Sequence, residues 1–459
     1  MRFLASTVSA FLLPCVAVSQ WPLDPEGWTV MQPSPGVTTT IYVSNSLGDD
    51  INFDGLHPYP ISATQGPKQT IRAGYDLLRD GYPDWLLLKA GDTFTSPQDA
   101  MDASYPWTKS GISTTEPMIF GSYWSENEPP PRPRIVCNDQ ALRIYTAVGV
   151  KNLLVTGIHF ECPNPANPAV MFARGIYMIG GGPNIPNKSV RIEDCYINGW
   201  WQGIAVDPWP SKFDSDISIR RCVVVDNFRV DSSVSPPGPV PNSGGLYVEQ
   251  TNGLLVEECV FDRNGWDGVN VSTRSIYNHN NYIQDDCTDV TIRGNISARG
   301  SADNYQVRPI GTIHNNLSLK APIHFHMGHD LDPMQPDPPR WADIKGNVAL
   351  EGDDIGPGSG LRGWAYFVQN VEVANSSMRY NIASNKGTAG GNPVSIELDG
   401  STQTGIQNLS VHHNVVSNWG APLTVNGVNM PNVVLHSNDI QDTNTISQLS
   451  PSRVRTRRP

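Results

Sequence analysis

Residues 190–206 read VRIEDCYINGWWQGIAV, and this stretch decides the fold. Its first half places Ile192 three positions before Cys195, and its second half ends in the short Gly-led run 203–206. Apolar, often β-branched residues that alternate with other residues predict strands with one face buried. Strands this short, joined by polar turns, cannot bury that face alone. They need neighbours that repeat the same pattern.

The pattern does recur after about residue 150. The first part of the unit is an apolar residue followed three positions later by Asn or Cys, and successive Asn or Cys positions lie 21 to 37 residues apart. These positions are Cys195, Cys222, Cys259, Asn295, Asn316, Asn347, Asn381, Asn414 and Asn438, with Asn381 in the weakest copy. The second part is a Gly-led strand at 175–178, 203–206, 245–248 and 268–271. Units that stack on copies of themselves predict a solenoid.

We therefore predict an all-β fold with a single parallel β-helix domain over 66–445. Asn side chains at the turn can bond from coil to coil, and Cys at the same place is a small apolar filler. Ile71, Tyr75 and Leu78 share one helical face, which predicts a short N-terminal helix that caps the first coil. The Pro-rich residues 20–65 predict an irregular segment. A β-propeller is the alternative, but no regular blade signature of ~40–50 residues is visible.

The net charge and the two ends of the chain indicate where the protein is located and which partners it can have. Arg2 and the apolar run after it predict a signal peptide over 1–19, hence a secreted, extracellular or periplasmic protein. No later segment is long and apolar enough to cross a membrane. The Arg-rich residues 446–459 predict a basic disordered tail. The formal charge of −12 argues against a nucleic-acid partner, and we expect a monomer.

Six cysteines lie outside the signal segment. We expect Cys195, Cys222 and Cys259, which share one position in the repeat, to be thiols. We expect Cys137 to pair with Cys162 in a disulfide. Six sequons are candidate glycosylation sites: Asn187, Asn270, Asn295, Asn316, Asn375 and Asn408.

The capping segment, the Val/Ile-x-Ile-x-x-Asn rungs and the Gly-Ile-x-Val strands resemble right-handed parallel β-helix proteins of the pectate-lyase-like superfamily. The resemblance covers roughly residues 65–445. It is specific for the fold and not for one activity. It implies a right-handed coil and a carbohydrate-active protein with a polysaccharide substrate.

Outward residues of the Gly-led strands form two predicted columns, with neighbours roughly 4.8 Å apart. One column holds Tyr177, Ala205, Tyr247, Asn270, Gln306 and His324. The other holds Asp207, Glu249, Ser272, Arg308 and His326, and Glu397 and Asp399 continue the face. Such a surface offers hydrogen bonds to sugar hydroxyls and rings for stacking. We predict substrate binding by Asp207, Glu249, Asn270, Gln306 and Asp267, although Asp267 also suits a turn.

The densest part of this face carries four of the ten histidines. His324 or His326 could act as a base that titrates near neutral pH. Arg308 suits a bidentate grip on a carboxylate. With Asp330 the two histidines could instead ligate a metal, but we assign no metal ligands. A bound calcium is one way to offset the negative charge beside an anionic substrate.

Three functions are compatible with these residues. The first is a polysaccharide lyase that acts on uronate-containing glycans by β-elimination. Arg308 would neutralise the developing enolate, His324 or His326 would be the base, and Tyr247 would donate a proton. The second is a glycoside hydrolase, and the third is a non-catalytic β-helix that binds glycans.

The hydrolase hypothesis rests on paired carboxylates. A Gln-Asp-Asp-Cys motif looks like the paired-Asp motif of polygalacturonase-type glycoside hydrolases, which implies Asp285 and Asp286 as an acid/base pair. The Gly-His-Gly and Arg-Ile-Lys elements of that family are absent, and a polar turn explains the motif equally well. Asp207 with Glu249, or Asp267 with Asp285, are the other candidate pairs.

Overall fold

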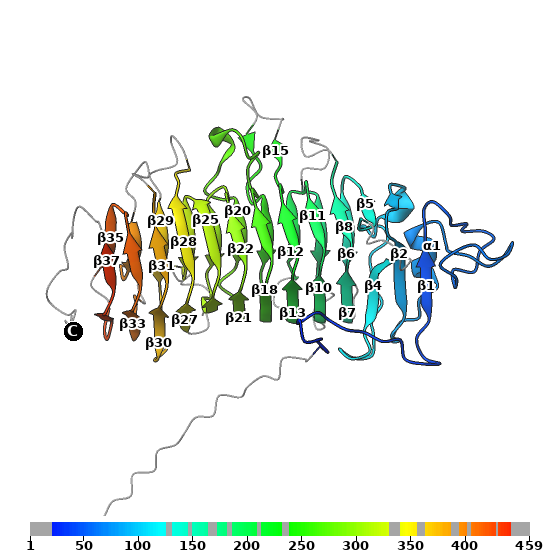
Figure 1. Ribbon diagram of the computed structural model, residues 1–459, viewed down its shortest axis with the longest axis horizontal. Helices are drawn as coiled ribbons and strands as arrows, with labels where there is room; N and C mark the ends of the chain where they lie inside the picture. The colour runs from blue at the N-terminus through cyan, green and yellow to red at the C-terminus, as the bar shows by residue number, and fades with distance from the viewer. Residues whose placement is uncertain are drawn as a thin grey trace, which may run out of the picture.

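The chain folds into a parallel β-helix (Figure 1). A computed structural model describes residues 21–441, apart from 125–130, 146–148, 164–171, 181–185, 209–212, 232–237, 330–339, 356–362, 387–393, 402–404 and 428–429. The predicted signal peptide over 1–19, the predicted tail over 446–459 and Asp330 lie outside the described residues.

Three long parallel sheets run along the described part of the chain, because each full coil gives one strand to each sheet. The first sheet holds, in order, β1 (Thr40–Val43), β2 (Trp85–Lys89), β4 (Met118–Tyr123), β7 (Lys151–Thr156), β10 (Lys188–Glu193), β13 (Asp214–Arg220), β18 (Thr251–Glu257), β21 (Thr288–Arg293), β24 (Gly311–His314), β27 (Ala342–Lys345), β30 (Ser376–Arg379), β33 (Leu409–His412) and β36 (Val434–His436).

The second sheet holds β3 (Thr93–Phe94), β5 (Arg134–Val136), β8 (His159–Glu161), β11 (Tyr196–Asn198), β14 (Val223–Val225), β19 (Val260–Asp262), β22 (Ile296–Ala298), β25 (Leu317–Ala321), β28 (Val348–Gly352), β31 (Ile382–Ser384), β34 (Val415–Ser417) and β37 (Asp439–Gln441). The third sheet holds β6 (Gln140–Ile144), β9 (Arg174–Met178), β12 (Gln202–Val206), β17 (Gly244–Val248), β20 (His279–Ile283), β23 (Asp303–Val307), β26 (Ile323–Met327), β29 (Trp364–Gln369), β32 (Val394–Asp399) and β35 (Ala421–Asn426).

The remaining elements are short. β15 (Val230–Asp231) pairs antiparallel with β16 (Gly238–Pro239), and η1 (Pro97–Asp99) and η3 (Val271–Thr273) are single 3₁₀ turns. No helix within the described ranges is long and apolar enough to span a membrane. The architecture confirms the predicted all-β, right-handed parallel β-helix.

The β-helix begins earlier in the chain than the predicted boundary at residue 66. β1 lies within the predicted irregular segment 20–65 and pairs with β2, because its alternate side chains are buried. α1 (Ile71–Asp76) follows the N-cap Thr70 and buries Ile71 and Tyr75 at the end of the core. The predicted capping helix is therefore confirmed (Figure 1).

The predicted Asn ladder occupies the turn between the first and second sheets. Asn295 donates from Nδ2 to Asn316 Oδ1 at 3.0 Å, and Asn316 donates in the same way to Asn347 at 3.0 Å. The same bond continues through Asn381, Asn414 and Asn438. A buried amide needs such partners. Glycosylation at Asn187, Asn295 and Asn316 is excluded because these side chains are buried.

In the earlier coils the ladder position is filled by Cys195, Cys222 and Cys259, which are buried thiols as predicted. The predicted disulfide between Cys137 and Cys162 is wrong, because both residues are thiols. Cys162 is buried, and its Sγ lies 2.6 Å from Nη2 of Arg229. The Cys162 sulfur therefore contacts Arg229 in the protein interior.

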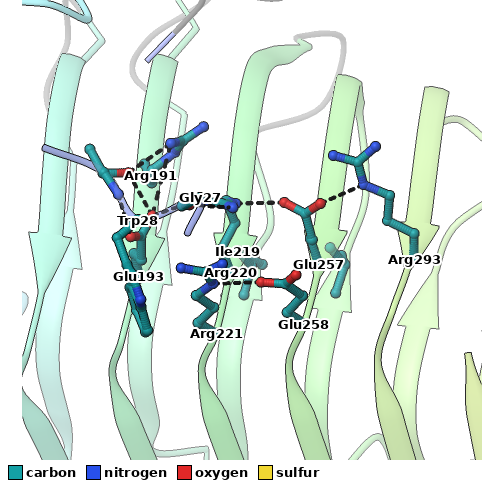
Figure 2. A network of polar contacts seen from close by, with 12 residues as sticks. Gly27, Trp28, Arg191, Glu193, Ile219, Arg220, Arg221, Glu257, Glu258 and Arg293 are labelled. Carbon is teal, nitrogen blue, oxygen red and sulfur yellow. Dashed lines mark hydrogen bonds and ion pairs between the residues drawn. The ribbon is translucent and has the colours of Figure 1, made fainter. Parts of the chain in front are cut away.

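Residues 21–31, which we call the strap, lie across the outer face of the first sheet (Figure 2). Trp21 packs on Ile119. The backbone N–H of Thr29 donates to Glu193 Oε1 at 2.9 Å, and the Thr29 hydroxyl donates to Oε2 at 2.6 Å.

A row of alternating charges crosses the first sheet beside the strap (Figure 2). Arg220 contacts Glu193 at 2.9 Å and Glu257 at 2.7 Å, and Arg293 contacts the other oxygen of Glu257 at 2.5 Å. Arg220 also donates to the carbonyl of Gly27 in the strap at 3.0 Å. Arg220 and Glu193 are buried, so each charge depends on its partners.

Candidate functional site

The third sheet carries the first of the two predicted outward columns, although some of its residues differ from the prediction. Strand pairing aligns Tyr177, Ala205, Tyr247, Tyr282, Gln306, His326, Phe367 and Glu397 in successive coils. Tyr177, Ala205, Tyr247 and Gln306 lie in this column as predicted. His326, and not His324, continues it, and Tyr282 takes the place predicted for Asn270.

A cavity of about 380 Å³ opens on this face of the third sheet. That volume is in the range of sites that bind small ligands. Its polar lining includes Asn242, His279, Tyr282, Asp303, Gln306, Arg308, His326, His329 and Gln369. Its aromatic lining includes Tyr277, Trp364 and Phe367, and the rings of Trp364 and Phe367 stack at 4.7 Å between centroids. We call this cavity the pocket.

Two histidines flank one buried carboxylate in the pocket. Asp303 Oδ2 lies 2.8 Å from His279 Nδ1, and Asp303 Oδ1 lies 3.3 Å from His326 Nδ1. Burial alone would raise the pKa of Asp303, but the contacts with the two imidazoles outweigh it and hold that pKa well below its usual range. Asp303 therefore stays ionised between the two Nδ1 atoms, in close contacts that do not have hydrogen-bond geometry, and the Nε2 atoms are left for chemistry.

Arg308 supplies the strong cation of the pocket. Its Nη1 donates to Gln284 Oε1 at 2.9 Å and lies 4.0 Å from Asp285 Oδ2. Its guanidinium carbon lies 4.9 Å from the centre of the Tyr282 ring. The side chain is held by these neighbours and still borders the pocket. A carboxylate bound there would have a fixed partner.

A pair of acids lies beside the pocket, on two earlier coils. Tyr247 donates to Glu249 Oε2 at 2.6 Å, and Tyr177 donates to Asp207 Oδ2 at 3.2 Å. Burial and the neighbouring Asp207 raise the pKa of Glu249 to about 8, against the opposing hydrogen bond from Tyr247. Glu249 is thus a carboxylic acid at neutral pH. The structure brings the predicted residues Asp207, Glu249 and Tyr247 together, next to the pocket lining rather than in it.

Asn270 and Asp267 lie outside the strands of the third sheet, which corrects the predicted place of Asn270 in the column, while substrate binding by either residue stays a prediction. The run 268–271 is not a strand, and the strand that pairs with β17 is β20. Asp267 Oδ1 accepts hydrogen bonds from the backbone N–H groups of Val269 and Asn270, at 2.8 and 2.7 Å. Asp267 is therefore a turn residue, and Asn270, like Ser272 of η3, belongs to the excursion between β19 and β20.

His324 is not a surface base, which corrects the prediction. Its side chain is fully buried, and its Nδ1 lies 2.7 Å from Ser318 Oγ. Ser318 also accepts from Asn304 Nδ2 at 2.8 Å. Asn304 is the last member of a second buried ladder, formed by Asn227, Asn264, Asn280 and Asn304. Burial lowers the pKa of His324 to about 3, so it is a neutral core residue.

The two aspartates of the Gln-Asp-Asp-Cys motif separate. Asp285 lies near Arg308 and 3.7 Å from His329 Nδ1. Asp286 Oδ1 accepts from the backbone N–H of Gln250 at 2.9 Å, at the turn into the next coil. This hydrogen bond supports the role of a turn residue for Asp286.

Among the described residues, no group of three or more His, Cys, Asp or Glu side chains is arranged to hold a metal ion. Asp330, which the sequence offers as a partner for His324 and His326, is not among those residues. Calcium therefore stays a prediction.

The sequence reasoning missed the centre of the pocket. His279 and Asp303 come from the first positions of β20 and β23, and Tyr282 follows His279 by three residues. The sequence held one signal for these residues. Asp303 and Gln306 are three positions apart, as His279 and Tyr282 are in the preceding coil. Trp364 lies at the corresponding first position of β29.

No protein-family model matches the chain, and no curated protein matches its sequence. Solved structures with a similar fold include the Dettilon tailspike protein, at 11% identity over 88% of this chain and 68% of that chain, with a TM-score of 0.48. Another is a lacto-N-biosidase from Eubacterium ramulus, at 11% identity over 91% and 67%, with a TM-score of 0.39. A rhamnogalacturonan lyase matches at 14% identity over 83% and 82%, with a TM-score of 0.39. These likenesses concern the fold alone and leave the family open.

Proposed function

We propose that this is a secreted carbohydrate-active enzyme, active as a monomer, that cleaves uronate-containing polysaccharides by β-elimination. The observation that carries the proposal is the carboxylate of Asp303 between His279 and His326, in the same pocket as Arg308. Elimination needs a base, an acid and a neutralised carboxylate, and these side chains provide all three.

The bond changes follow from the positions of these groups. Arg308 binds the uronate carboxylate and stabilises the negative charge that develops on it. Nε2 of His326 takes the proton from the sugar carbon next to that carboxylate. The released electron pair forms the C4–C5 double bond, and the C4–O4 bond breaks. His279 gives a proton to the leaving oxygen.

Asp303 is the positioning residue of this scheme. Its negative charge lies beside Nδ1 of His326 and stabilises the positive charge that develops there when Nε2 takes a proton, and its second oxygen lies beside Nδ1 of His279. Trp364 and Phe367 supply an aromatic surface for a neighbouring sugar ring. The sequence predicted Tyr247 as the proton donor. His279 takes that role in the proposal, because the Tyr247 hydroxyl donates a hydrogen bond to Glu249.

The test is a panel of acidic and neutral polysaccharides, with ultraviolet absorbance of the unsaturated product as the readout. We expect unsaturated product from at least one uronate polymer. His326→Ala and Arg308→Ala should each lower its rate by at least about 100-fold, with unchanged β-rich circular dichroism. His436→Ala, on β36 of the first sheet, is the matched control and should leave the rate unchanged. Full activity of both pocket variants would overturn the proposal.

A glycoside hydrolase is the second candidate, because Glu249 is a protonated acid beside Asp207. Asp207 is near enough to raise the pKa of Glu249, and a glycoside hydrolase needs two such carboxyl groups on either side of the bond that is cleaved. Reducing ends without unsaturated product, lost in Glu249→Gln, would establish this function instead. Binding without any product would establish a non-catalytic glycan-binding β-helix.

A further inference from the structure

The amide of Gln306 lies in the wall of the pocket without a protein partner. The side chain is only 6% exposed, and among the described residues none hydrogen-bonds to either end of the amide. Two neighbouring glutamines hold protein side chains instead. Gln284 accepts a hydrogen bond from Arg308 at 2.9 Å, and Gln369 donates one to Asp399 at 2.8 Å. Because buried polar atoms are seldom left unsatisfied, the Gln306 amide is the group that a ligand in the pocket has to satisfy.

Gln306 lies between the residues that act on the substrate. Strand pairing places it next to His326 of the following coil, at roughly 4.8 Å for the usual strand spacing. Arg308 follows it by two residues and also lines the pocket, at roughly 7 Å along the strand. A uronate whose carboxylate is bound at Arg308, and whose neighbouring carbon is at His326, therefore has the rest of its ring beside Gln306.

The free hydroxyl groups of such a uronate match an amide. In a chain linked through O1 and O4, a uronate keeps its hydroxyls on the adjacent carbons C2 and C3. An amide offers an acceptor oxygen beside donor hydrogens, and a hydroxyl both donates and accepts. The last side-chain torsion of glutamine is soft, so the amide can turn both ends toward the sugar. One hydroxyl then donates to Oε1 of Gln306, and its neighbour accepts from Nε2.

We propose that Gln306 determines specificity by binding the C2 and C3 hydroxyls of the uronate at Arg308, so that cleavage is restricted to uronates on which both hydroxyls are free. This inference rests on the proposed lyase function. An O-acyl group replaces a hydroxyl donor with a bulkier ester and leaves the buried amide incompletely bonded. A site built to bind a hydroxyl discriminates strongly against its absence. An esterase that removes O-acyl groups is therefore the class of enzyme that supplies this substrate from an acylated polymer.

The first experiment uses the unmodified protein. The uronate polymers that it cleaves, with polygalacturonate and alginate tried first, are partly acetylated by chemical means, and mass spectrometry locates the acetyl groups in the products. The uronate that was bound at Arg308 becomes the unsaturated end of a product. We expect acetyl groups on these ends to be at least about 100-fold rarer than in the polymer.

Two outcomes of this experiment have different meanings. Acetyl groups that are as frequent on the unsaturated ends as in the polymer would overturn the inference and leave the lyase function standing. No unsaturated product from any uronate polymer, acetylated or not, would overturn the lyase function itself.

A variant tests whether the amide is the cause. Gln306→Met keeps an unbranched side chain of similar length and removes the amide donor and acceptor. On unacetylated polymer we expect kcat/KM to fall about 10- to 100-fold, with unchanged β-rich circular dichroism. The frequency of acetyl groups on unsaturated ends should rise to within about tenfold of the polymer average.

The matched control is Gln140→Met, which changes a glutamine of β6 at the far end of the same sheet. It should alter neither kcat/KM nor the position of the acetyl groups. Unsaturated ends that are as free of acetyl groups with Gln306→Met as with the unmodified protein would also overturn the inference, because the discrimination would then arise elsewhere.

Discussion

His324 makes the stability of the β-helix sensitive to acid. Its ring is fully buried at the end of the second Asn ladder, against Ser318 and the ring of Trp419. Burial lowers the pKa of His324 to about 3 from its ordinary value of 6.5. The unfolded chain therefore binds a proton in the pH window between these values, and the folded chain does not.

The sign and size of the effect follow from this difference. Because the unfolded state binds more protons between about pH 3 and 6.5, the free energy of unfolding falls as pH falls through that window. One unit of pKa difference is worth about 1.4 kcal/mol. Lowering the pH from 7 to 5 should cost about 2 kcal/mol from this residue, and further acidification to pH 3 brings the loss to about 4 kcal/mol.

The assay is equilibrium urea unfolding at pH 7 and pH 5 for the unmodified protein and for His324→Asn. Asn is the appropriate replacement because Asn304 holds the same position in the preceding coil and also bonds to Ser318. We expect the pH-dependent loss of the unmodified protein to exceed that of the variant by about 2 kcal/mol. Equal losses in both proteins would refute the assignment of His324 as a buried neutral imidazole.

Two further predictions concern other parts of the coil. Burial beside Asp207 raises the pKa of Glu249 to about 8, so the folded state holds the proton that the unfolded chain releases, and stability falls as pH rises from about 4.5 to 8. Glu249→Gln should raise the melting temperature at pH 8 and leave it nearly unchanged at pH 4.5, and equal shifts at both values would contradict this reading. Asn316→Leu leaves the Nδ2 group of Asn295 without its acceptor, at a cost of about 3 kcal/mol or more in urea unfolding. The exposed Asn52→Ala is the comparison, and a similar small loss in both variants would show that the ladder adds little.

The fold could be predicted because its repeat is chemically simple. An inward Asn or Cys after a β-branched strand recurs in coil after coil, and the amides bond as that position requires. Even the weak copy that ends at Asn381 proves to be a full member of the ladder. The local sequence pattern therefore predicts the tertiary contacts directly, because each coil contacts only the coils next to it.

The site was harder to predict because strict alternation fails near the start of two strands of the third sheet, β20 and β26. In β26, His324 and Phe325 both point inward before His326 points outward. The same break occurs in β20, where Asn280 and Asn281 are buried and polar. A search for apolar inward residues therefore passes over β20 and selects the run 268–271, which alternates correctly but lies in an excursion. His279 was missed because of that choice of strand.

The strap also determines when the first described residues can finish folding. Gly27 is bound by Arg220, which lies 193 residues later in the chain. At a synthesis rate of ~5–20 residues per second, the first described residues wait roughly 10 to 40 s for the strand on which they dock. Trp21 waits for less of the chain, because Ile119 and Leu154, on which it packs, precede Arg220. Residues 21–31 thus complete their contacts only after the middle of the chain has been made.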